Sequence, residues 1–338
     1  MSQPLNRPKI VILGASGQIG SVVFRRLCLA FPQADIIGCV RNLGKPIEIN
    51  AHANYLQFDP FHDNWGMLGK ITVLINSIGI IEEKPGMGFQ KVHQGLTDLM
   101  LQHRAQLGNP KLIQVSVLGA DTESPSAFLR TKALADETLL KHPNTVVIRP
   151  SIVCTPNTVM VQKLRMLGKI SLYLAGYLPF PRGFANTRIQ PILGDELADL
   201  MAVLCRHNQH PSLIQAVGPV TFSIRHLIGQ LCKKPIRLLP IPQTLFDQAF
   251  KVISFLLPKL LNREQFQLLK HDNIADAAVC EDLLGKPLSS TETFWKEELG
   301  SEPFVKSSSL AKVIFPATAH KSEKSKLNQF PGQKSHTP

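Results

Sequence analysis

Three glycines at fixed spacing form the first feature of the chain that could bind a ligand. Gly14-Ala-Ser-Gly17-Gln-Ile-Gly20 directly follows the apolar run Lys9–Leu13 and opens a helical pattern of apolar residues. In this context the first glycine allows a sharp turn, the second lets the backbone approach a diphosphate, and the third lets a helix pack on the strand. The diphosphate would meet N–H groups at the positive end of the helix. The sequence therefore predicts dinucleotide contacts at Gly14, Ser16, Gly17, Gln18, Ile19 and Gly20.

The end of the next apolar run, residues 35–40, indicates which dinucleotide binds. NAD-binding proteins usually place an acid there for the ribose 2′-OH, whereas an arginine suits the 2′-phosphate of NADP. Arg41 follows this run, Lys45 lies just beyond, and the acid Asp35 lies too early, at its start. A guanidinium can bind a phosphate through paired hydrogen bonds, although an arginine here can also simply be solvated. We expect NADP(H) in preference to NAD(H).

Two further stretches are predicted to contact the cofactor. Asp59 closes the third predicted strand, where it could accept a hydrogen bond from the adenine amino group or instead cap the next turn. Ser77-Ile78-Gly79 follows the fourth predicted strand and offers a glycine where the backbone must pass close to a ribose.

These residues need elements that position them, and the first 150 residues alternate between strands and helices. Strands are predicted at 9–13, 35–40, 55–58, 72–76, 112–117 and 145–148, with helices at 89–106 and 126–141. Such alternation makes a parallel sheet with helices on both faces. Beyond residue 150, helices are predicted at 157–169, 195–206, 223–232, 244–257 and 262–270, and strands only at 213–217 and 236–239.

The expected fold is α/β, a Rossmann-like doubly wound parallel sheet with a smaller, mostly helical C-terminal region. That region would pack on the carboxyl edge of the sheet, where open α/β sheets bind ligands. The predicted divisions are an extension at 1–8, the Rossmann core at 9–150, the C-terminal region at 151–300 and a disordered basic tail at 301–338. The tail carries six lysines against two glutamates.

Composition limits the class of protein. The 338 residues are 44% hydrophobic and 18% charged, which excludes a disordered or collagen-like chain. Uncharged apolar stretches reach only about a dozen residues, whereas a membrane-spanning helix needs roughly 20. The polar N-terminus has no signal-peptide pattern, so we expect a cytoplasmic protein.

The net charge of +12 fits an anionic cofactor or an anionic membrane surface. With two Trp and three Tyr there are few platforms for base stacking, so no nucleic-acid partner is expected. The six cysteines form no C-x-x-C pair and are expected to be reduced. His207 and His210 have metal-like spacing but no nearby carboxylate, so no metal site is predicted.

Later motifs resemble the short-chain dehydrogenase/reductase superfamily, whose extended and atypical branches carry the same glycine pattern. Ser116 matches the catalytic serine position, and Ser126-Ala-Phe128-Leu-Arg-Thr-Lys132 matches S-x-Y-x-x-x-K with Phe128 in the Tyr place. Arg149-Pro150-Ser151 matches the R-P-S that lines the nicotinamide side of the cofactor. The resemblance implies that Ser116, Lys132 and Pro150 contact the cofactor, and that Ser116 and Lys132 hold the catalytic positions.

A narrower resemblance is to the nucleotide-binding accessory subunit of respiratory complex I and its bacterial relatives, over about residues 9–285. It rests on Ser116-Val-Leu-Gly-Ala-Asp121, Ser124-Pro-Ser, Gln190-Pro191 and Arg263-Glu-Gln265 leading to Asp272-Asn273. It implies a tightly held, largely structural NADPH and a position at the membrane arm of a complex, at the inner face of the inner membrane. Close relatives are also linked to ubiquinone synthesis. Cys154-Thr155 departs from the usual Phe-Gly.

Two functions follow from these residues. Phe128 cannot donate a proton, which favours a cofactor-binding protein without ordinary reductase activity. The alternative is a reductase with another proton donor, for which Cys154, His93 and Tyr177 are candidates.

Basic amphipathic stretches at 161–184 and 243–261 predict peripheral attachment to a membrane or membrane complex, although such helices can equally cover a substrate pocket.

Overall fold

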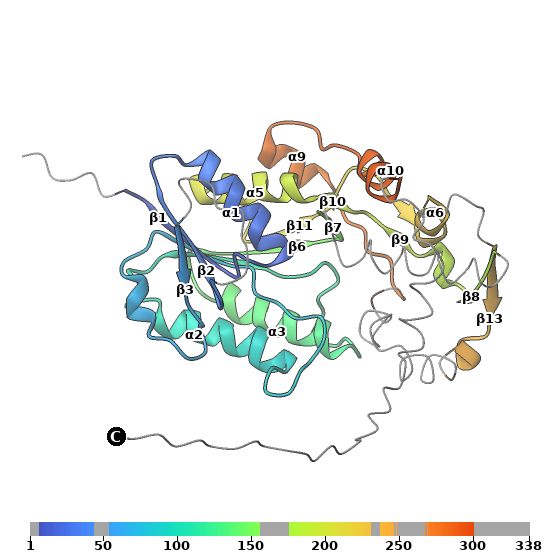
Figure 1. The fold of residues 1–338 in the computed structure, drawn as a ribbon, viewed down its shortest axis with the longest axis horizontal. Helices are drawn as coiled ribbons and strands as arrows, with labels where there is room; N and C mark the ends of the chain where they lie inside the picture. The colour runs from blue at the N-terminus through green and yellow to red at the C-terminus, as the bar shows by residue number, and fades with distance from the viewer. Residues whose placement is uncertain are drawn as a thin grey trace, which may run out of the picture. The chain divides into compact units, whose positions relative to one another are not determined.

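Seven parallel strands make the central sheet of the protein (Figure 1). The structure is a computed structural model, and it describes residues 7–43, 54–155, 176–230, 237–246, 248, 268 and 270–300. All of these belong to one compact unit, Met1–Ser301. The strand order is β11-β6-β5-β4-β1-β2-β3. The strands are β1 Lys9–Leu13, β2 Asp35–Val40, β3 Asn54–Gln57, β4 Val73–Asn76, β5 Lys111–Val115, β6 Thr145–Pro150 and β11 Leu213–Ala216. The predicted doubly wound α/β fold is confirmed.

The central strands are buried on both faces, which is why they read as continuous apolar runs. Every residue of β4 and β5 is buried, including Lys111 at the start of β5. The predicted limits of the first two strands match β1 and β2. The predicted strand at 213–217 is β11, which pairs with β6 and extends this sheet from within the C-terminal half of the chain.

Helices cover both faces of the sheet (Figure 1). On one face α1 Gln18–Ala30 packs against α5 Gly194–Arg206, and their apolar residues form one core cluster with the sheet. On the other face lie α2 Leu96–His103 and α3 Ala127–Leu140. A π-helical turn, η2 Lys91–Gly95, precedes α2, so the helix expected at 89–106 is interrupted.

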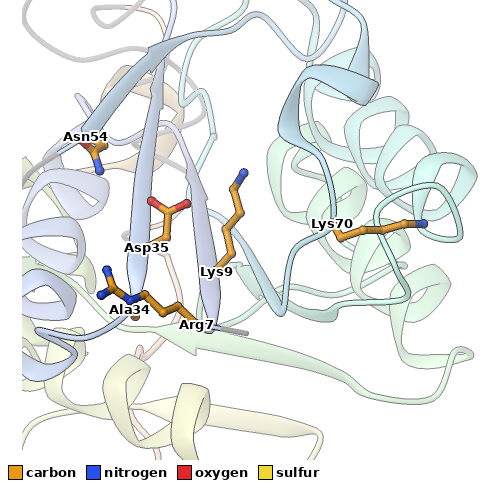
Figure 2. A pocket seen from close by; sticks show the side chains of 6 residues that line it. All are labelled: Arg7, Lys9, Ala34, Asp35, Asn54 and Lys70. Atoms are coloured by element: carbon orange, nitrogen blue, oxygen red, sulfur yellow. The ribbon is translucent and has the colours of Figure 1, made fainter. Parts of the chain in front are cut away.

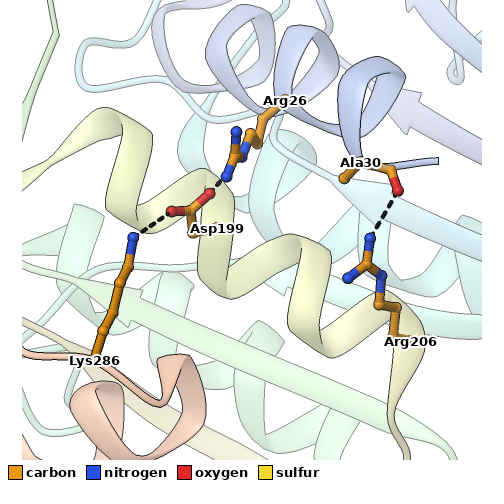
Figure 3. Close-up of polar contacts among 5 residues, drawn as sticks. All are labelled: Arg26, Ala30, Asp199, Arg206 and Lys286. Atoms are coloured by element: carbon orange, nitrogen blue, oxygen red, sulfur yellow. Dashed lines mark hydrogen bonds and ion pairs between the residues drawn. The ribbon is translucent and has the colours of Figure 1, made fainter. Parts of the chain in front are cut away.

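Polar contacts fix the α1–α5 pair (Figure 3). Asp199 of α5 lies between Arg26 of α1 and Lys286, and its carboxylate pairs with both. Arg206, at the end of α5, donates to the carbonyl of Ala30 at 2.7 Å. These bonds bring the C-terminal half of the chain onto the first helix, and so help to hold the glycine loop that precedes it.

Short strands and helices make up the rest of the described C-terminal region. β7 Val153–Cys154 pairs with β10 Ile192–Leu193, β9 Arg188–Ile189 with β12 Phe222–Ser223, and β8 Tyr177–Pro181 with β13 Arg237–Ile241. The helical elements are η1 Trp65–Leu68, η3 Phe184–Asn186, α6 Ile224–Gln230, α9 Ala278–Leu284 and α10 Glu292–Gly300. The predicted strand at 236–239 corresponds to β13, but the expectation of only two strands beyond residue 150 was wrong. Four of the missed strands have two residues each, too few to show a period of two, and β8 contains two prolines, which are rare within strands.

Several predictions fall outside the described residues. They include the 1–6 part of the extension, the helix at 157–169, most of the helices at 244–257 and 262–270, the tail and Lys45. Of the amphipathic stretch 161–184, the described part contains β8, in which Leu178 is buried. Among the residues that the structure describes, no helix has the length and apolar composition that a bilayer crossing requires.

Candidate dinucleotide site

The glycine loop joins β1 to α1, and at its glycines there is little room for a side chain. Gly14 adopts φ +80°, and the N–H groups of Gly14 and Ala15 both donate to the Cys39 carbonyl, at 3.2 and 3.1 Å. A β-carbon at Gly20 would lie 2.2 Å from the Gly14 carbonyl oxygen. The turn, the end of β2 and the start of α1 are therefore held in close contact by residues that must lack a side chain.

The start of α1 has the chemistry of an anion site. Its N-cap, Gly17, is extended and makes no side-chain cap, and no acid lies in the first turn. Ser16, Gly17 and Gln18 are exposed, and Ile19 is half-buried. The Gln18 amide donates to the Val153 carbonyl at 3.4 Å. A diphosphate fits this cradle, because the exposed first-turn amides of a helix lack intrahelical acceptors.

The Ser77–Gly79 stretch lies beside this loop. The Ser77 hydroxyl donates to the Leu13 carbonyl at 2.7 Å, and the N–H of Ile78 donates to Asn76 Oδ1 at 3.0 Å. A β-carbon at Gly14 would come within 2.9 Å of Ile78 Cγ1. The structure thus brings together two stretches that the sequence assigned to one cofactor.

Arg41 follows β2 and is exposed, at the sheet edge where Cys39 contacts the glycine loop. Asp35 pairs in register with Lys9 at the opposite end of the strand, so it is far from that edge. Asp59 makes a local turn: its Oδ1 accepts from the N–H of Phe61 at 3.0 Å, and Oδ2 lies 3.2 Å from His62 Nδ1. Of the two alternatives for Asp59, an adenine contact or a turn cap, these contacts match the turn cap.

The two motif positions on α3 lie one helical turn apart and are buried. Phe128 is 7% exposed and Lys132 is 5% exposed. The Lys132 ammonium donates to the Val115 carbonyl at 3.0 Å, and a β-carbon at Gly79 would lie 3.3 Å from its Nζ. Burial lowers the pKa of Lys132 to about 8, against the opposing effect of Asp136. Lys132 and the glycine loop therefore both lie against the stretch Ser77–Gly79.

Ser116 has a partner that no motif indicated. Its hydroxyl donates to Asp136 Oδ2 at 2.6 Å, and Arg149 Nε donates to the same oxygen at 2.8 Å. Gln114 donates to Asp136 Oδ1 at 3.3 Å, and Asp136 is fully buried. Sequence reasoning missed Asp136, although a carboxylate four residues after Lys132 on the apolar face of a helix was a usable signal. Pro150 ends β6, and its carbonyl accepts from the N–H of Leu118 at 2.8 Å.

The three candidate proton donors lie in different places. His93 is buried, with its ring edge-on to Phe128 at a centroid distance of 5.6 Å. Cys154 is buried in β7, and burial raises the pKa of its thiol, which makes it a poor acid. The Tyr177 hydroxyl accepts from Arg237 at 3.1 Å on the small β8–β13 sheet. Of the three, the structure brings His93 to the Phe128 position.

A C-terminal segment is bonded to the loops after β5 and β6. The amide of Asn273 donates to the Leu118 carbonyl at 3.1 Å, and its Oδ1 accepts from the Ser151 hydroxyl at 2.5 Å. The backbone of Asn273 bonds to Arg188 and Gln190. The Gln190 and Asp272-Asn273 motifs are therefore hydrogen-bonded to each other at the carboxyl edge of the sheet.

Two other places do not contribute to the site. A depression of about 490 Å³ is lined by Arg7, Lys9, Ala34, Asp35, Asn54 and Lys70, at the amino ends of the strands, and Lys70 points away from it (Figure 2). His210 Nε2 lies 2.6 Å from the Lys111 ammonium, which also caps the carbonyls at the end of α5. Within the described part of the chain, no group of three or more His, Cys, Asp or Glu side chains could hold a metal ion.

A curated protein is similar to the chain in sequence over part of its length, and no protein-family model matches the chain. The chain is 31% identical over 156 residues to NADH dehydrogenase (ubiquinone) 1 alpha subcomplex subunit 9, mitochondrial, of Arabidopsis thaliana. The match covers 44% of this chain and 37% of that protein, so it spans well under half of the relative.

Solved structures share the fold over most of the chain. A dTDP-glucose 4,6-dehydratase from Bacillus anthracis in complex with NAD has a TM-score of 0.62 and 16% identity, covering 87% of this chain and 96% of that one. A UDP-glucuronic acid 4-epimerase from Bacillus cereus in complex with NAD has a TM-score of 0.63 and 17% identity, covering 86% and 97%. The chain therefore has the fold of these two NAD-complexed structures and, over the matched 156 residues, is similar in sequence to that subunit of NADH dehydrogenase.

Proposed function

We propose that the chain binds one NADP(H) in a structural or regulatory role, without ordinary carbonyl reduction, in association with a respiratory or quinone-related membrane complex. The observation that carries this proposal is Phe128. It occupies the proton-donor position of the motif, while the glycine cradle and Lys132 of the same site are intact. The residues that would bind the cofactor are present, whereas the acid that would donate a proton is missing. This combination favours a protein that binds the cofactor without catalysing carbonyl reduction.

The binding half of the proposal rests on two features. The glycine loop presents exposed backbone next to the start of α1, where a diphosphate is stabilised. Lys132 donates to Val115, and an ammonium has three donors. Among the described residues, no second acceptor is bonded to this ammonium, so two N–H groups remain for hydroxyls of the cofactor. When bound, the nicotinamide would supply the capacity for hydride transfer.

The chemical half concerns the proton that carbonyl reduction needs. General acid catalysis is worth about 10² to 10⁴ in rate, and Phe128 has no acidic group. The hydroxyl of Ser116 is engaged by the Asp136 carboxylate, which accepts its proton in a hydrogen bond of 2.6 Å. A hydroxyl held in this way is not directed to a substrate oxygen, so Ser116 does not replace the missing phenol.

The rival function is an NADPH-dependent reductase that uses another acid, and His93 is its best candidate because it contacts Phe128. Burial, together with the charge of Lys132, lowers the pKa of His93 to about 2; the nearby Ile80 carbonyl opposes this shift only in part. The imidazole is therefore neutral at physiological pH and has no imidazolium proton to give. This argues for the structural role.

Association with a membrane complex is inferred from the partial match to a complex I subunit and from the basic net charge of +12. We propose peripheral attachment at the inner face of an inner membrane, reached from the cytoplasmic side. Anionic lipid contributes about 1 kcal/mol per nearby Lys or Arg. Flotation of the full chain with anionic and neutral liposomes at low and high salt tests this. Binding should be confined to anionic vesicles at low salt; no flotation together with a free monomer in cell extracts would contradict the proposal.

The test of the chemical role compares the wild type with Phe128→Tyr on a panel of quinones and carbonyl compounds, at saturating NADPH. The wild type should show no turnover near ~10 s⁻¹, a typical enzyme value, whereas Phe128→Tyr should gain activity on at least one compound. Lys132→Met in the Tyr background is the control, and it should remove the gained activity. Wild-type turnover at enzymatic rates would establish the reductase instead.

A further inference from the structure

Residues 272–275, which we call the strap, lie beside β9 at the carboxyl edge of the sheet. The N–H of Asn273 donates to the Arg188 carbonyl at 2.7 Å, and the Asn273 carbonyl accepts from the N–H of Gln190 at 3.0 Å, as in a pair of parallel strands. The Asp272 carboxylate pairs with the Arg188 guanidinium at 2.6 Å, and both side chains are exposed. The strap is therefore paired through its backbone and fastened by a surface ion pair.

The side chain of Asn273 joins the loops that follow two neighbouring strands. Its amide donates to the carbonyl of Leu118, in the loop after β5, at 3.1 Å. Its Oδ1 accepts from the hydroxyl of Ser151, which directly follows β6, at 2.5 Å. Ser151 is buried and Asn273 is half-buried. One asparagine thus connects both loops to the strap.

The side chain of Gln190 connects the strap to a third strand. It accepts from the N–H of Ala275 at 3.0 Å and donates to the carbonyl of Gly218, in the loop after β11, at 2.7 Å. This contact is close, because a β-carbon at Gly218 would lie 2.0 Å from the Pro191 carbonyl oxygen. Since β11, β6 and β5 are consecutive in the sheet, the strap is tied to the carboxyl ends of three adjacent strands.

These three strands lie at the end of the sheet toward which the nicotinamide half of the proposed dinucleotide would extend. Arg41 follows β2 and Ser77 follows β4, and these two strands flank β1. A dinucleotide at the glycine loop would therefore reach from β2 past β4, toward β5 and β6. The loop after β6 also contacts the cradle, because the Val153 carbonyl accepts from the Gln18 amide at 3.4 Å. Ser151 precedes Val153 by two positions, which connects the strap to the start of α1.

We propose that the strap is a gate on the nicotinamide side of the site, with Asn273 as its positioning residue, and that the dinucleotide enters and leaves only when the two side-chain bonds of Asn273 open. This inference rests on the proposed binding of NADP(H), and it gives a physical cause for slow exchange of the cofactor. The opening is local, because it breaks the bonds of Asn273 to Leu118 and Ser151 and leaves the seven-stranded sheet intact.

The test measures the association and dissociation rates of NADPH by stopped-flow fluorescence, on the full chain freed of bound nucleotide. Asn273→Ala removes both side-chain bonds. Because a gate must open for entry as well as for exit, both rates should rise by the same factor, roughly 5- to 150-fold for two neutral hydrogen bonds. The dissociation constant should stay near that of the wild type. His271→Gln, at an exposed position beside the strap, is the matched control and should leave both rates unchanged.

Asn273→Asp provides a second variant of the same size, in case Asn273→Ala does not fold. It retains an acceptor for the Ser151 hydroxyl and loses only the donor to the Leu118 carbonyl. Both NADPH rates should therefore rise by a smaller factor, roughly 2- to 12-fold for one neutral hydrogen bond. Adenosine 2′,5′-bisphosphate lacks the nicotinamide half and does not pass the strap, so its rates should be the same in the wild type and in each variant.

Unchanged NADPH rates in a folded variant of Asn273 would overturn the gate. A rise of the dissociation rate alone, with a matching loss of affinity, would also overturn it, because Asn273 would then only support the bound state. Equal acceleration of adenosine 2′,5′-bisphosphate would contradict the placement of the gate on the nicotinamide side. A wild type that binds neither NADPH nor the bisphosphate would instead refute the proposed function.

Discussion

The hydroxyl of Ser116 donates to the buried carboxylate of Asp136 across 2.6 Å. Ser116 directly follows β5, and Asp136 lies one helical turn after Lys132 on α3. The carboxylate also accepts from Arg149 at 2.8 Å. The serine position of the motif is therefore tied to the structural support of the site, and its catalytic role stays a prediction.

Replacing Asp136 should destabilise the fold strongly. Asp136→Asn removes the negative charge opposite Arg149 and replaces one of the two accepting oxygens with a donor NH₂ group. Breaking a buried ion pair by removing one charged partner costs about 3–5 kcal/mol. Urea unfolding measures the loss. Glu137→Gln is the matched control, since Glu137 is exposed on the same helix and should change stability by less than ~0.5 kcal/mol. Similar losses for the two variants would show that the buried cluster contributes little.

The pH dependence of stability should report the buried ammonium of Lys132. Its folded-state pKa is about 8, below the ordinary value of 10.5, so between these values the unfolded chain binds more protons than the folded one. The contribution of this group to stability therefore rises with pH from about 8 to 10.5. Below pH 8 the charged form costs the fold on the order of 3 kcal/mol, at roughly 1.36 kcal/mol per pKa unit.

The measurement is the difference in unfolding free energy between Lys132→Met and wild type, followed from pH 7 to pH 10.5. The other titrating groups cancel in this difference. The variant should be the more stable protein at pH 7, and its advantage should shrink toward pH 10.5. A difference that is flat across this range would mean that Lys132 is not desolvated as the structure implies.

Gly20→Ala should abolish dinucleotide binding, because its β-carbon would lie 2.2 Å from the Gly14 carbonyl oxygen. The helix start and the loop would have to separate, which destroys the cradle. Gly95→Ala is the control: the nearest atom to its β-carbon, the Gln90 carbonyl oxygen, is 3.9 Å away. Equilibrium binding of NADPH should be lost in the first variant and retained in the second. Retained binding in Gly20→Ala would place the diphosphate elsewhere.

Arg41→Ala should remove the preference for NADPH over NADH. A charged hydrogen-bonded contact is worth about 1.5–3 kcal/mol, so NADPH affinity should fall roughly 10- to 150-fold while NADH affinity stays the same. Arg25→Ala removes the same charge from an exposed position on α1 and should leave both affinities unchanged. The assignment of Arg41 is wrong if the wild type prefers NADH, or if Arg41→Ala keeps its preference for NADPH.

The sequence predicts the parts of the site that depend on local chain geometry. After their charged first residues, Lys9 and Asp35, the runs at 9–13 and 35–40 carry no polar side chain except the thiol of Cys39, because both faces of the sheet are covered. These runs coincide with β1 and β2. The glycine pattern could be read because strand, turn and helix are adjacent in the chain. Gly38 adds to this fit: a β-carbon there would lie 2.8 Å from that of Ala15.

What the sequence did not predict depends on contacts between distant segments. His93 meets Phe128 across 35 positions, and Asn273 bonds to Leu118 across 155, so neither contact has a local pattern. The strands β9 and β12 have two residues each, too few for a period of two to be visible. The π-helical turn at Lys91–Gly95 is an irregularity that a search for helical spacing passes over.

Both the glycine loop and Lys132 are proposed to hold one dinucleotide. The most direct measurement is the nucleotide released on denaturing the purified full chain, identified and quantified by chromatography, for wild type and for Gly20→Ala. We expect close to one NADP(H) per wild-type chain, slow to exchange with added labelled NADPH, and none in Gly20→Ala. A wild type that carries no nucleotide, and that also fails to bind added NADPH or NADH, would contradict it.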